Sequence, residues 1–380
     1  MRLVVSGGGT GGHVYPALTI IEALRRPAGS TLPGLDSIDL LWIGSRGGIE
    51  EEMIRRAGID FIGLPTGALR EAGGLTAIRN AARIIRSIGR ARSIIHRHNP
   101  DVVLVTGGHV CVAVALAAWT KRRPILIYLP DIVPGLAVRF LSRFAAKIAV
   151  TSEESYPYFR REKVVVTGYP VRADIYTLDR TTARRALGLD PELKTLLVFG
   201  GSRGARSINQ ALMAGLRELL PLCQVVHISG RLDADWVAGM ARGLPDSLQG
   251  RYYHSDYLHE MPQALVAADL AVARAGAATL GEFPAAGLPA ILVPYPYSGK
   301  HQLPNATFMA RNGAALVLAD AELPQQLIPT ILQVLQDDDQ LASMRESMKA
   351  MARPDAAELI AEQLWLLARR RMASQIGAPS

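Results

Sequence analysis

The chain has 380 residues, of which 49% are apolar, 20% charged and 6% aromatic, and it carries a formal net charge of +8. This length predicts two domains with separate cores, since domains usually hold about 100–200 residues. The balance of apolar and charged residues excludes a collagen and a disordered tail, and two cysteines exclude a disulfide-stapled scaffold. We expect Cys111 and Cys223 to be buried free thiols.

The positive charge lies in the first half of the chain. Residues 1–170 contain 22 Lys and Arg against 13 Asp and Glu, whereas the rest is nearly neutral. This asymmetry predicts an anionic ligand or surface for the first domain. Nucleic acid is not the expected partner, because no helix-turn-helix, zinc finger or aromatic RNA-binding strand is present. The first apolar run is too short for a signal peptide and the longest, residues 110–119, is shorter than the about 20 residues of a membrane span, so we expect a soluble protein.

Short apolar runs alternate with longer helical stretches along the chain. Their apolar residues are consecutive, as in parallel strands covered on both faces. The alternation predicts an α/β protein with two doubly wound, Rossmann-like parallel-sheet domains facing a cleft. We expect these domains to be residues 1–168 and 169–354, with closing helices at about 323–350 and 355–372, the last packing back on the first domain. The predicted strands are residues 3–6, 40–43, 61–64, 102–106, 125–129, 148–151, 164–167, 196–199, 225–229, 252–254, 270–273, 290–293 and 315–318.

The first predicted strand ends in a glycine-rich stretch, residues 7–13 (GGGTGGH), before a helix that we expect to open at Pro16. Glycines let the backbone approach a ligand closely, and a helix start offers N–H groups to an anion. Three of these glycines also match the G-x-G-x-x-G pattern of dinucleotide-binding loops. That pattern requires an acidic residue closing the second strand, where residues 42–45 read Trp-Ile-Gly-Ser, so a nicotinamide or flavin site is disfavoured.

A second glycine loop, residues 200–205 (GGSRGA), has the same place in the second predicted domain. Neither loop is followed by the Lys-Ser or Lys-Thr pair of an ATP-binding P-loop. Both loops follow the carboxyl ends of strands, where open α/β sheets bind ligands. Two such loops in tandem domains predict a phosphate-bearing ligand held between the domains.

Together with further motifs, these loops resemble the MurG family of glycosyltransferases over nearly the whole chain. Members of that family have the GT-B fold, need no metal, and transfer N-acetylglucosamine from UDP-N-acetylglucosamine to lipid I, giving lipid II for peptidoglycan. The resemblance implies this activity, an undecaprenyl-diphosphate-linked acceptor, no cofactor, and a peripheral place on the cytoplasmic face of the cell membrane. The matching segments are residues 7–13, 101–108 (DVVLVTGG), 168–172 (GYPVR), 200–205, 274–282 (RAGAATLGE) and 294–305.

The resemblance also implies roles for single residues. On the acceptor side, the residues bordering the diphosphate and acceptor would be Thr10, Gly11 and Gly12. Those contacting UDP would be Arg172, Gly201, Ser202 and the backbone of Leu258. Those lining the nucleotide would be Ala277, Ala278, Thr279, Leu280, Gly281 and Glu282. Glu282 would accept hydrogen bonds from the ribose hydroxyls, and Gln302 would bind the sugar.

A departing diphosphate must be stabilised, either by a metal or by helix starts and arginines. Asp233 and Asp235 have the spacing of a D-x-D metal motif, but they follow Gly-Arg where a helix opens, and acidic residues suit a helix start. Because no second cluster of ligands accompanies them, we expect no metal there. Arg172 or Arg274 and the second glycine loop can supply the stabilisation instead.

The acceptor hydroxyl needs a general base. His13 is our candidate, although its imidazole could instead close the loop through a backbone hydrogen bond. His109 and Asp131 are the rivals. The chain departs from the family at His109, where an aromatic residue is usual, and at residues 128–131 (YLPD), where His-Glu-Gln-Asn is frequent. The alternative function is therefore a related UDP-sugar transfer to a different lipid or small-molecule acceptor.

Residues Leu75–His98 have the pattern of a basic amphipathic helix. Apolar residues recur at near-helical spacing, and arginines flank them throughout. This pattern suits an anionic membrane surface. It also suits a helix that packs on the core and leaves an arginine face in water. The apolar positions are Leu75, Ile78, Ala82, Ile85 and Ile88, and the arginines are Arg79, Arg83, Arg86, Arg90, Arg92 and Arg97.

Overall fold

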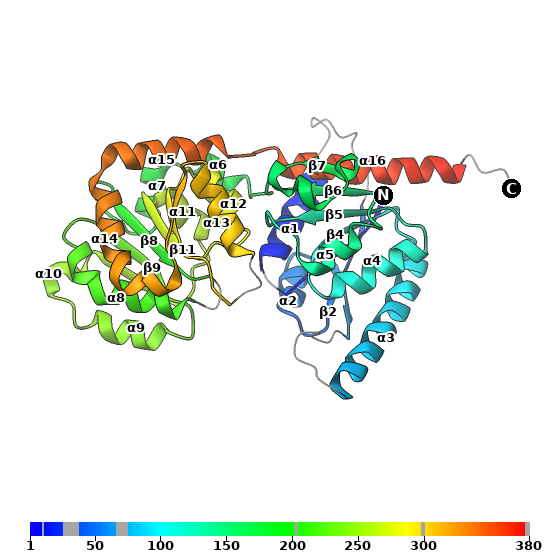
Figure 1. The fold of residues 1–380 in the computed structure, drawn as a ribbon, viewed down its shortest axis with the longest axis horizontal. Helices are drawn as coiled ribbons and strands as arrows, with labels where there is room; N and C mark the ends of the chain where they lie inside the picture. The colour runs from blue at the N-terminus through cyan, green and yellow to red at the C-terminus, as the bar shows by residue number, and fades with distance from the viewer. Residues whose placement is uncertain (10, 26–37, 66–74, 202–203, 298–300, 377–380) are drawn as a thin grey trace. The chain divides into compact units, whose positions relative to one another are not determined.

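The computed structural model describes residues 1–9, 11–25, 38–65, 75–201, 204–297 and 301–376, with the side chains of all of these except 75–85 and 375–376. The chain divides into two compact units, one of Met1–Pro170 with Asp355–Ser380 and one of Val171–Pro354. Each unit is built on one parallel sheet with helices around it (Figure 1). This architecture confirms the predicted α/β class of two Rossmann-like, doubly wound domains.

The sheet of the first unit has seven strands in the order β3-β2-β1-β4-β5-β6-β7. All of its pairs are parallel, and the order reverses at β1, which pairs with both β2 and β4. Every residue of β4 and β5 is buried, which is why these strands are consecutive apolar runs in the sequence. The strands are β1 (Arg2–Gly7), β2 (Asp39–Ser45), β3 (Asp60–Leu64), β4 (Val102–Gly107), β5 (Ile125–Leu129), β6 (Lys147–Val150) and β7 (Val164–Val166).

Helices cover both faces of this sheet, and α16 packs against α1 and β4 (Figure 1). The prediction that the first helix opens at Pro16 was wrong, because α1 begins at Gly11. Val14 and Pro16 are both buried, so packing of this face holds the helix in place although Pro16 has no N–H to donate. The helices are α1 (Gly11–Arg25), α2 (Ile49–Arg56), α3 (Leu75–His98), α4 (Val110–Thr120), α5 (Leu136–Leu141), α16 (Ala356–Ile376) and the short 3₁₀ segments Glu153–Tyr158 and Arg161–Lys163.

The sheet of the second unit has six parallel strands in the order β10-β9-β8-β11-β12-β13. Its order reverses at β8, which pairs with β9 and β11 and thus repeats the position of β1. The strands are β8 (Thr195–Phe199), β9 (Gln224–Ile228), β10 (Tyr252–Ser255), β11 (Leu270–Ala273), β12 (Ala290–Leu292) and β13 (Ala315–Val317).

The predicted helix over residues 323–350 is two helices, α14 and α15. Asp337 separates them, and its carboxylate accepts a 2.8 Å hydrogen bond from the N–H of Gln340, which caps α15. The break lets α14 pack against α8 and α15 against α12. The helices of this unit are α6 (Asp174–Thr177), α7 (Arg180–Ala186), α8 (Arg206–Leu219), α9 (Ala234–Ala241), α10 (Asp246–Gln249), α11 (Met261–Ala267), α12 (Thr279–Ala286), α13 (Gln302–Arg311), α14 (Leu323–Gln336), α15 (Asp338–Ala350) and the 3₁₀ segment Asp320–Glu322.

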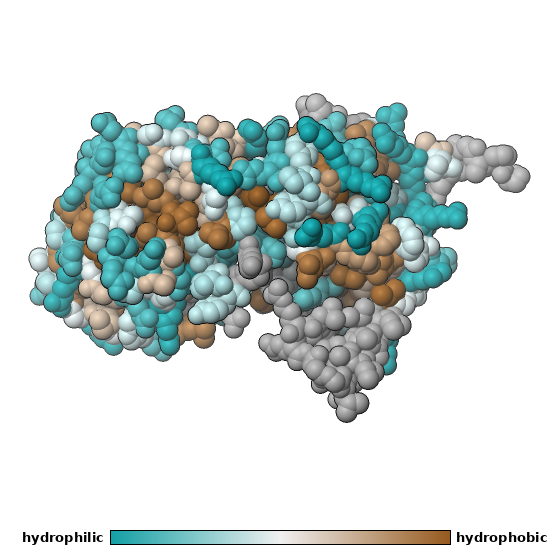
Figure 2. Space-filling view, in the orientation of Figure 1, coloured by the Kyte–Doolittle hydropathy of each residue, from teal (hydrophilic) through white to brown (hydrophobic). Residues whose placement is uncertain are grey.

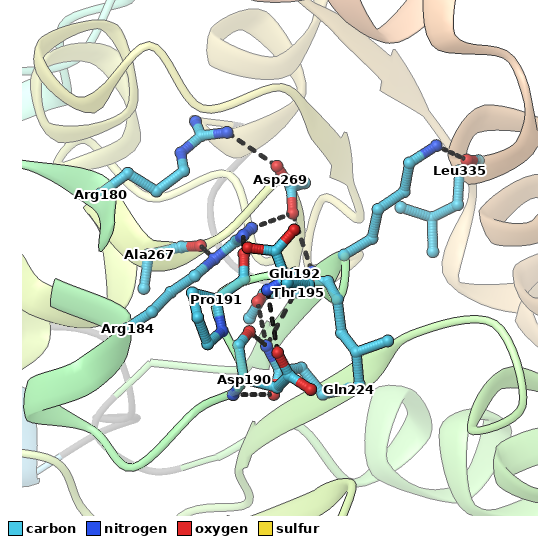
Figure 3. A network of polar contacts seen from close by, with 12 residues as sticks. Arg180, Arg184, Asp190, Pro191, Glu192, Thr195, Gln224, Ala267, Asp269 and Leu335 are labelled. Carbon is cyan, nitrogen blue, oxygen red and sulfur yellow. Dashed lines mark hydrogen bonds and ion pairs between the residues drawn. The ribbon is translucent and has the colours of Figure 1, made fainter. Parts of the chain in front are cut away.

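A polar network fixes the amino ends of the strands in the second sheet (Figure 3). The carboxylate of Asp269 accepts the N–H of Thr195 at 2.8 Å and Nη1 of Arg180 at 2.7 Å. The buried guanidinium of Arg184 also pairs with Asp269 and donates to the carbonyl of Ala267. Because Thr195 opens β8 and Asp269 precedes β11, this network lies at the edge opposite the second glycine loop. It stabilises the sheet and does not contribute to a site at that loop.

Both cysteines are free and buried, as the sequence predicted. Burial raises the pKa of the Cys111 thiol to about 11 and that of the Cys223 thiol to about 12. Neither thiol is therefore available as a thiolate near neutral pH.

Candidate functional site

The two glycine loops follow the two strands at which the strand order reverses. The first joins β1 to α1, and the second joins β8 to α8. Open α/β sheets bind ligands at such points, outside the carboxyl ends of the strands. Each unit therefore presents one candidate binding loop.

The first loop packs against the end of β4, and only glycine fits at the contact. A Cβ on Gly7 would lie 2.1 Å from Oγ1 of Thr106. Gly108 has a φ of +94°, and a Cβ there would lie 2.6 Å from the carbonyl oxygen of Gly8. The segment 107–108 at the carboxyl end of β4 therefore belongs to the same site as the loop.

His13 lies in the first turn of α1 with its ring turned back to the loop. Its Nδ1 is 3.1 Å from the carbonyl oxygen of Gly8. A carbonyl oxygen can only accept, so Nδ1 carries the proton and Nε2 is the unprotonated nitrogen of the neutral ring. The carbonyl of His13 in turn accepts the Thr106 hydroxyl at 2.8 Å. The hydrogen bond from Nδ1 to Gly8 is thus compatible with a role of His13 as a base, because it leaves Nε2 as the unprotonated nitrogen.

The two rival bases also lie in the first unit. His109 immediately precedes α4, is exposed, and makes no capping hydrogen bond. Asp131 is half-buried just after β5. Of the two histidines, His13 is the one whose tautomer is fixed by a hydrogen bond to the loop.

The structure adds a carboxylate that the sequence did not reveal. Glu50, in the first turn of α2, reaches the end of β2, where the sequence showed no acidic residue. Its side chain is 1% exposed, with Oε1 accepting the N–H of Ser45 at 2.9 Å and Oε2 that of Gly9 at 3.2 Å. An acidic residue in the first turn after a Gly-Gly pair was the available signal, and it is easily read as a helix-dipole charge.

The second loop is as tight as the first. A Cβ on Gly200 would lie 2.2 Å from the N atom of Ala205. Gly204 has a φ of +76°, and a Cβ there would meet the carbonyl of Ser229. Helix α8 then begins at Arg206, and Ala205 offers no side-chain cap to its first N–H groups. Such a helix start suits an anion. Gly201 lies in this loop, while Ser202 and, in the first loop, Thr10 lie outside the described residues.

Glu282 lies in the first turn of α12, which follows β11, the neighbour of β8. Burial raises the pKa of its carboxyl to about 7, and the charge of Arg172 acts in the opposite direction. Within the described part of the chain no hydrogen-bond donor reaches this carboxylate, so it can accept hydrogen bonds from a ligand. The backbone that leads to it consists of Ala277, Ala278, Thr279, Leu280 and Gly281.

The two candidate arginines differ in what holds them. The side chain of Arg172 is 47% exposed, and its Nε lies 3.8 Å from the carboxylate of Asp174. The side chain of Arg274 is 10% exposed, and its guanidinium donates to Asp320 at 2.5 Å and to the hydroxyl of Ser207 at 2.8 Å. Arg172 is therefore the arginine that can turn to a ligand, whereas Arg274 is committed within the unit.

Two further predicted contacts lie in loops of the second unit. Gln302 opens α13, and its Oε1 accepts the N–H of Tyr295 at 2.8 Å, so its amide nitrogen points to other partners. Leu258 lies half-buried after the carboxyl end of β10. Both positions are at the same edge of the sheet as the second glycine loop.

The D-x-D segment has a structural explanation. Asp233 is buried, and its carboxylate accepts Nε of Arg206 at 2.8 Å and Nδ2 of Asn209 at 2.9 Å. Asp235 is exposed on α9. Among the residues that the structure describes, no three His, Cys, Asp or Glu side chains gather as a metal site would require.

Comparison with known proteins defines the class. Residues 3–150 match the glycosyltransferase family 28 N-terminal domain, and residues 195–360 match the glycosyltransferase family 28 C-terminal domain. The protein is a glycosyltransferase of family 28.

Curated relatives define the family. A protein of Roseiflexus sp. (strain RS-1) is 40% identical over 98% of this chain and 96% of its own length, and one of Desulforudis audaxviator (strain MP104C) is 38% identical over 97% and 99%. Both are named UDP-N-acetylglucosamine–N-acetylmuramyl-(pentapeptide) pyrophosphoryl-undecaprenol N-acetylglucosamine transferase. The crystal structure of Acinetobacter baumannii MurG has the same fold, with a TM-score of 0.76, 24% identity, and coverage of 96% of this chain and 99% of that one. This chain belongs to the MurG family of these transferases, as its motifs predicted.

Proposed function

We propose that the protein transfers N-acetylglucosamine from UDP-N-acetylglucosamine to the 4-hydroxyl of the N-acetylmuramyl unit of lipid I, with inversion, giving lipid II. The observation that carries this proposal is a glycine loop at the reversal point of both sheets in a chain of this family. The names of the relatives supply the donor and the acceptor.

In the second unit, each candidate residue has a chemical role toward the donor. Glu282 would accept hydrogen bonds from the ribose hydroxyls, since no donor among the described residues reaches its carboxylate. Arg172 and the uncapped start of α8 would stabilise the diphosphate as it leaves. Gln302 would donate from its amide to sugar hydroxyls, and the backbone at Leu258 would contact the uracil side of UDP.

In the first unit, His13 would act as the general base. Its Nε2 would take the proton of the acceptor hydroxyl as that oxygen attacks the anomeric carbon. The new C–O bond forms while the bond to the UDP oxygen breaks, and UDP leaves with the electron pair. The N–H groups of Gly11 and Gly12, in the first turn of α1, would face the acceptor diphosphate.

A lipid-linked acceptor requires contact with a membrane. None of the helices in the described part of the chain is long and apolar enough to span one. In α3, the described side chains pack Ala91, Ile94 and Ile95 into the core and leave Arg86 and Arg90 exposed. The side chains of residues 75–85, which carry most of the predicted amphipathic pattern, lie outside the described ones.

The structure adds an exposed apolar surface near the basic helix α3. Trp119 at the end of α4 and Leu136 and Phe140 on α5 are exposed, and apolar surface covers this region in Figure 2. A pocket of about 570 Å³ lies beside it, lined by Leu136, Phe140, Arg139 and Arg143 among others. Exposed rings among arginines suit the headgroup layer of an anionic membrane. We propose that α3 and this surface attach the protein peripherally to the cytoplasmic face of the cell membrane.

Vesicle sedimentation tests this attachment. Wild-type protein should bind vesicles that contain anionic phospholipid, and binding should weaken with added salt. The double variant Arg86→Glu/Arg90→Glu should bind less, while the matched variant Arg185→Glu/Arg242→Glu, with the same charge change on the second unit, should bind as the wild type does. Equal sedimentation of both variants would contradict the proposal.

The acceptor is the part of the proposal with a specific alternative. Tyr128, which stands where the family often has histidine, is fully buried, and its hydroxyl lies 3.3 Å from Oγ1 of Thr151. Its side chain is therefore not available to an acceptor. Within the segment 128–131, Asp131 is then the polar side chain that could contact one. A different lipid or small-molecule acceptor is the second candidate function.

One experiment separates these candidates. The purified full-length protein is given UDP-N-acetylglucosamine with and without a lipid I analogue, and UDP release is measured. Release that depends on the analogue supports the proposal. Release that is indifferent to it would refute lipid I as the acceptor, and stimulation by diacylglycerol instead would favour the alternative.

A further inference from the structure

One peptide group in the first glycine loop connects two ionisable side chains. The Gly8–Gly9 peptide accepts the N–H of His13 Nδ1 on its carbonyl oxygen, at 3.1 Å, and donates its own N–H to Oε2 of Glu50, at 3.2 Å. We propose that Glu50 is a positioning residue that acts on His13 through this peptide. The inference rests on the proposed function, in which His13 is the base.

Glu50 is held in place by burial and by a hydrogen bond to each of its carboxylate oxygens. Its carboxylate is almost completely removed from water, where a charge is costly unless hydrogen bonds compensate it. Both oxygens accept backbone N–H groups, one from Gly9 in the loop and one from Ser45 at the end of β2. The carboxylate thereby ties the loop to the neighbouring strand.

Glycines on two segments leave the space that this carboxylate occupies. A Cβ on Gly8 would lie 2.2 Å from Oε1 of Glu50, and a Cβ on Gly48 would lie 2.5 Å from Oε2. Any other residue at either position would push the carboxylate away from the loop. Part of the glycine-rich sequence is therefore needed to make room for Glu50.

The effect on His13 follows from the direction of the hydrogen bonds. A carboxylate that accepts the N–H of a peptide polarises that peptide and strengthens its carbonyl oxygen as an acceptor, by about 10–30% per bond. This oxygen accepts only from the tautomer protonated at Nδ1, so the polarised peptide favours an unprotonated Nε2. In hydrolase triads a carboxylate contacts the imidazole directly to the same end. Here a peptide group stands between the two side chains.

A merely structural role for Glu50 makes a different prediction. If Glu50 only braced the loop, its replacement would lower stability without a specific change in the ring of His13. The tautomer of His13 distinguishes the two cases, because the ¹⁵N chemical shifts of a neutral imidazole report which nitrogen carries the proton. This measurement needs no substrate, so it stays informative even if the proposed acceptor is wrong.

The test compares Glu50→Gln with the wild type in the full-length protein labelled with ¹⁵N-histidine, at a pH where the ring is neutral. The His13 signals are assigned by their loss in His13→Gln. We expect the wild type to show the Nδ1–H tautomer and Glu50→Gln to show an increased share of the Nε2–H tautomer. We also expect kcat to fall by about 10-fold with the KM for the UDP-sugar unchanged.

Two further variants keep the test decisive. Glu51→Gln changes the adjacent, more exposed carboxylate, which pairs with Arg55 and the N–H of Gly47, and should leave the His13 spectrum unchanged. Should Glu50→Gln not fold, Gly48→Ala replaces it, because its Cβ would lie 2.5 Å from Oε2 of Glu50 and push the carboxylate away from Gly9. This variant should also show an increased share of the Nε2–H tautomer, which a merely structural role would not produce. A wild-type tautomer in Glu50→Gln, or the Nε2–H tautomer in the wild type, would overturn the inference. If the tautomer changes but lipid I is not a substrate, the proposed acceptor fails and the coupling of Glu50 to His13 remains.

Discussion

The charge of Arg172 and the burial of Glu282, which lie in the same unit, act in opposite directions on the pKa of the Glu282 carboxyl. Burial raises the pKa of Glu282 to about 7, and the positive charge of Arg172 limits this rise. Helix α6, which follows Arg172, packs against α12, which carries Glu282. The second unit thus keeps a titrating carboxyl and a partly exposed guanidinium near each other at the edge where the second glycine loop lies.

This raised pKa predicts how stability depends on pH. The folded state favours protonated Glu282, whereas the unfolded chain ionises it near pH 4.5. The stability that Glu282 contributes is therefore present below about pH 4.5 and is lost as the pH rises towards about 7. Glu282→Gln should gain stability relative to the wild type between pH 5 and pH 8, by up to about 2 kcal/mol.

Urea unfolding at several pH values checks this prediction. Glu218→Gln is the matched control, because Glu218 is exposed on α8. This variant measures the effect of removing a carboxyl that lies in water. A constant difference between Glu282→Gln and the wild type across this range would contradict the raised pKa.

Replacing the two candidate arginines should have different effects, one on UDP binding and the other on the stability of the protein. Arg172→Ala should weaken UDP binding by about 10-fold, the value of one charge-assisted hydrogen bond, and leave the melting temperature unchanged because the side chain is half-exposed. Arg274→Ala should instead lower the free energy of unfolding by about 3 kcal/mol, since it leaves the Asp320 carboxylate with the Ser207 hydroxyl but without its cation. Calorimetric titration with UDP and thermal unfolding measure the two effects. Unchanged UDP affinity in Arg172→Ala would remove this residue from the donor site.

His13 should matter for turnover more than for donor binding. His13→Ala should lower kcat by about 10²-fold or more if Nε2 removes the proton of the acceptor. UDP binding, which we assign to the second unit, should be unaffected. Steady-state kinetics with a lipid I analogue measures this, alongside His109→Ala and Asp131→Asn. Retention of most turnover by His13→Ala would transfer the role of base to whichever rival variant is inactive.

Asp233 should prove structural. Asp233→Ala removes the carboxylate that accepts from Arg206 and one of the two acceptors of the Asn209 amide, and it should cost about 2–4 kcal/mol of stability. Asp235→Ala, at an exposed position on α9, should change stability by less than about 0.5 kcal/mol. Turnover should persist in EDTA, because the carboxylate of Asp233 is occupied by protein donors. Loss of activity on chelation would instead support a metal at this motif.

The strands were predictable because parallel strands between two helical layers are apolar at every position. β5 and β11 match their predicted ranges, 125–129 and 270–273, and the other strands begin or end within a residue or two of them. The positions of both glycine loops follow from this strand pattern. Helix limits were less predictable, because burial of Val14 and Pro16 decided the start of α1, and a local cap at Asp337 divided α14 from α15.

The candidate site was predictable only where a motif names a residue. His13, Glu282 and Gln302 are marked by their motifs, but their hydrogen bonds depend on residues far away in the chain. Glu50 shows this limit, since 41 residues separate it from the N–H of Gly9 that it accepts. Arg274 shows it as well, because its commitment to Asp320 depends on a segment 46 residues later.

The amino-acid sequence by itself determined the α/β class, the alternation of strands and helices, the two glycine loops and the family. These features are local, because a run of apolar residues or a glycine pair acts on its own backbone whatever lies around it. Tertiary structure alone decided which polar groups are free to act: it committed Arg274 and Asp233 to partners, left Glu282 without a donor among the described residues, and brought Glu50 beneath the loop of His13. The physical reason is that burial and hydrogen bonding set the charge and orientation of a side chain, and both depend on segments that meet only when the chain has folded.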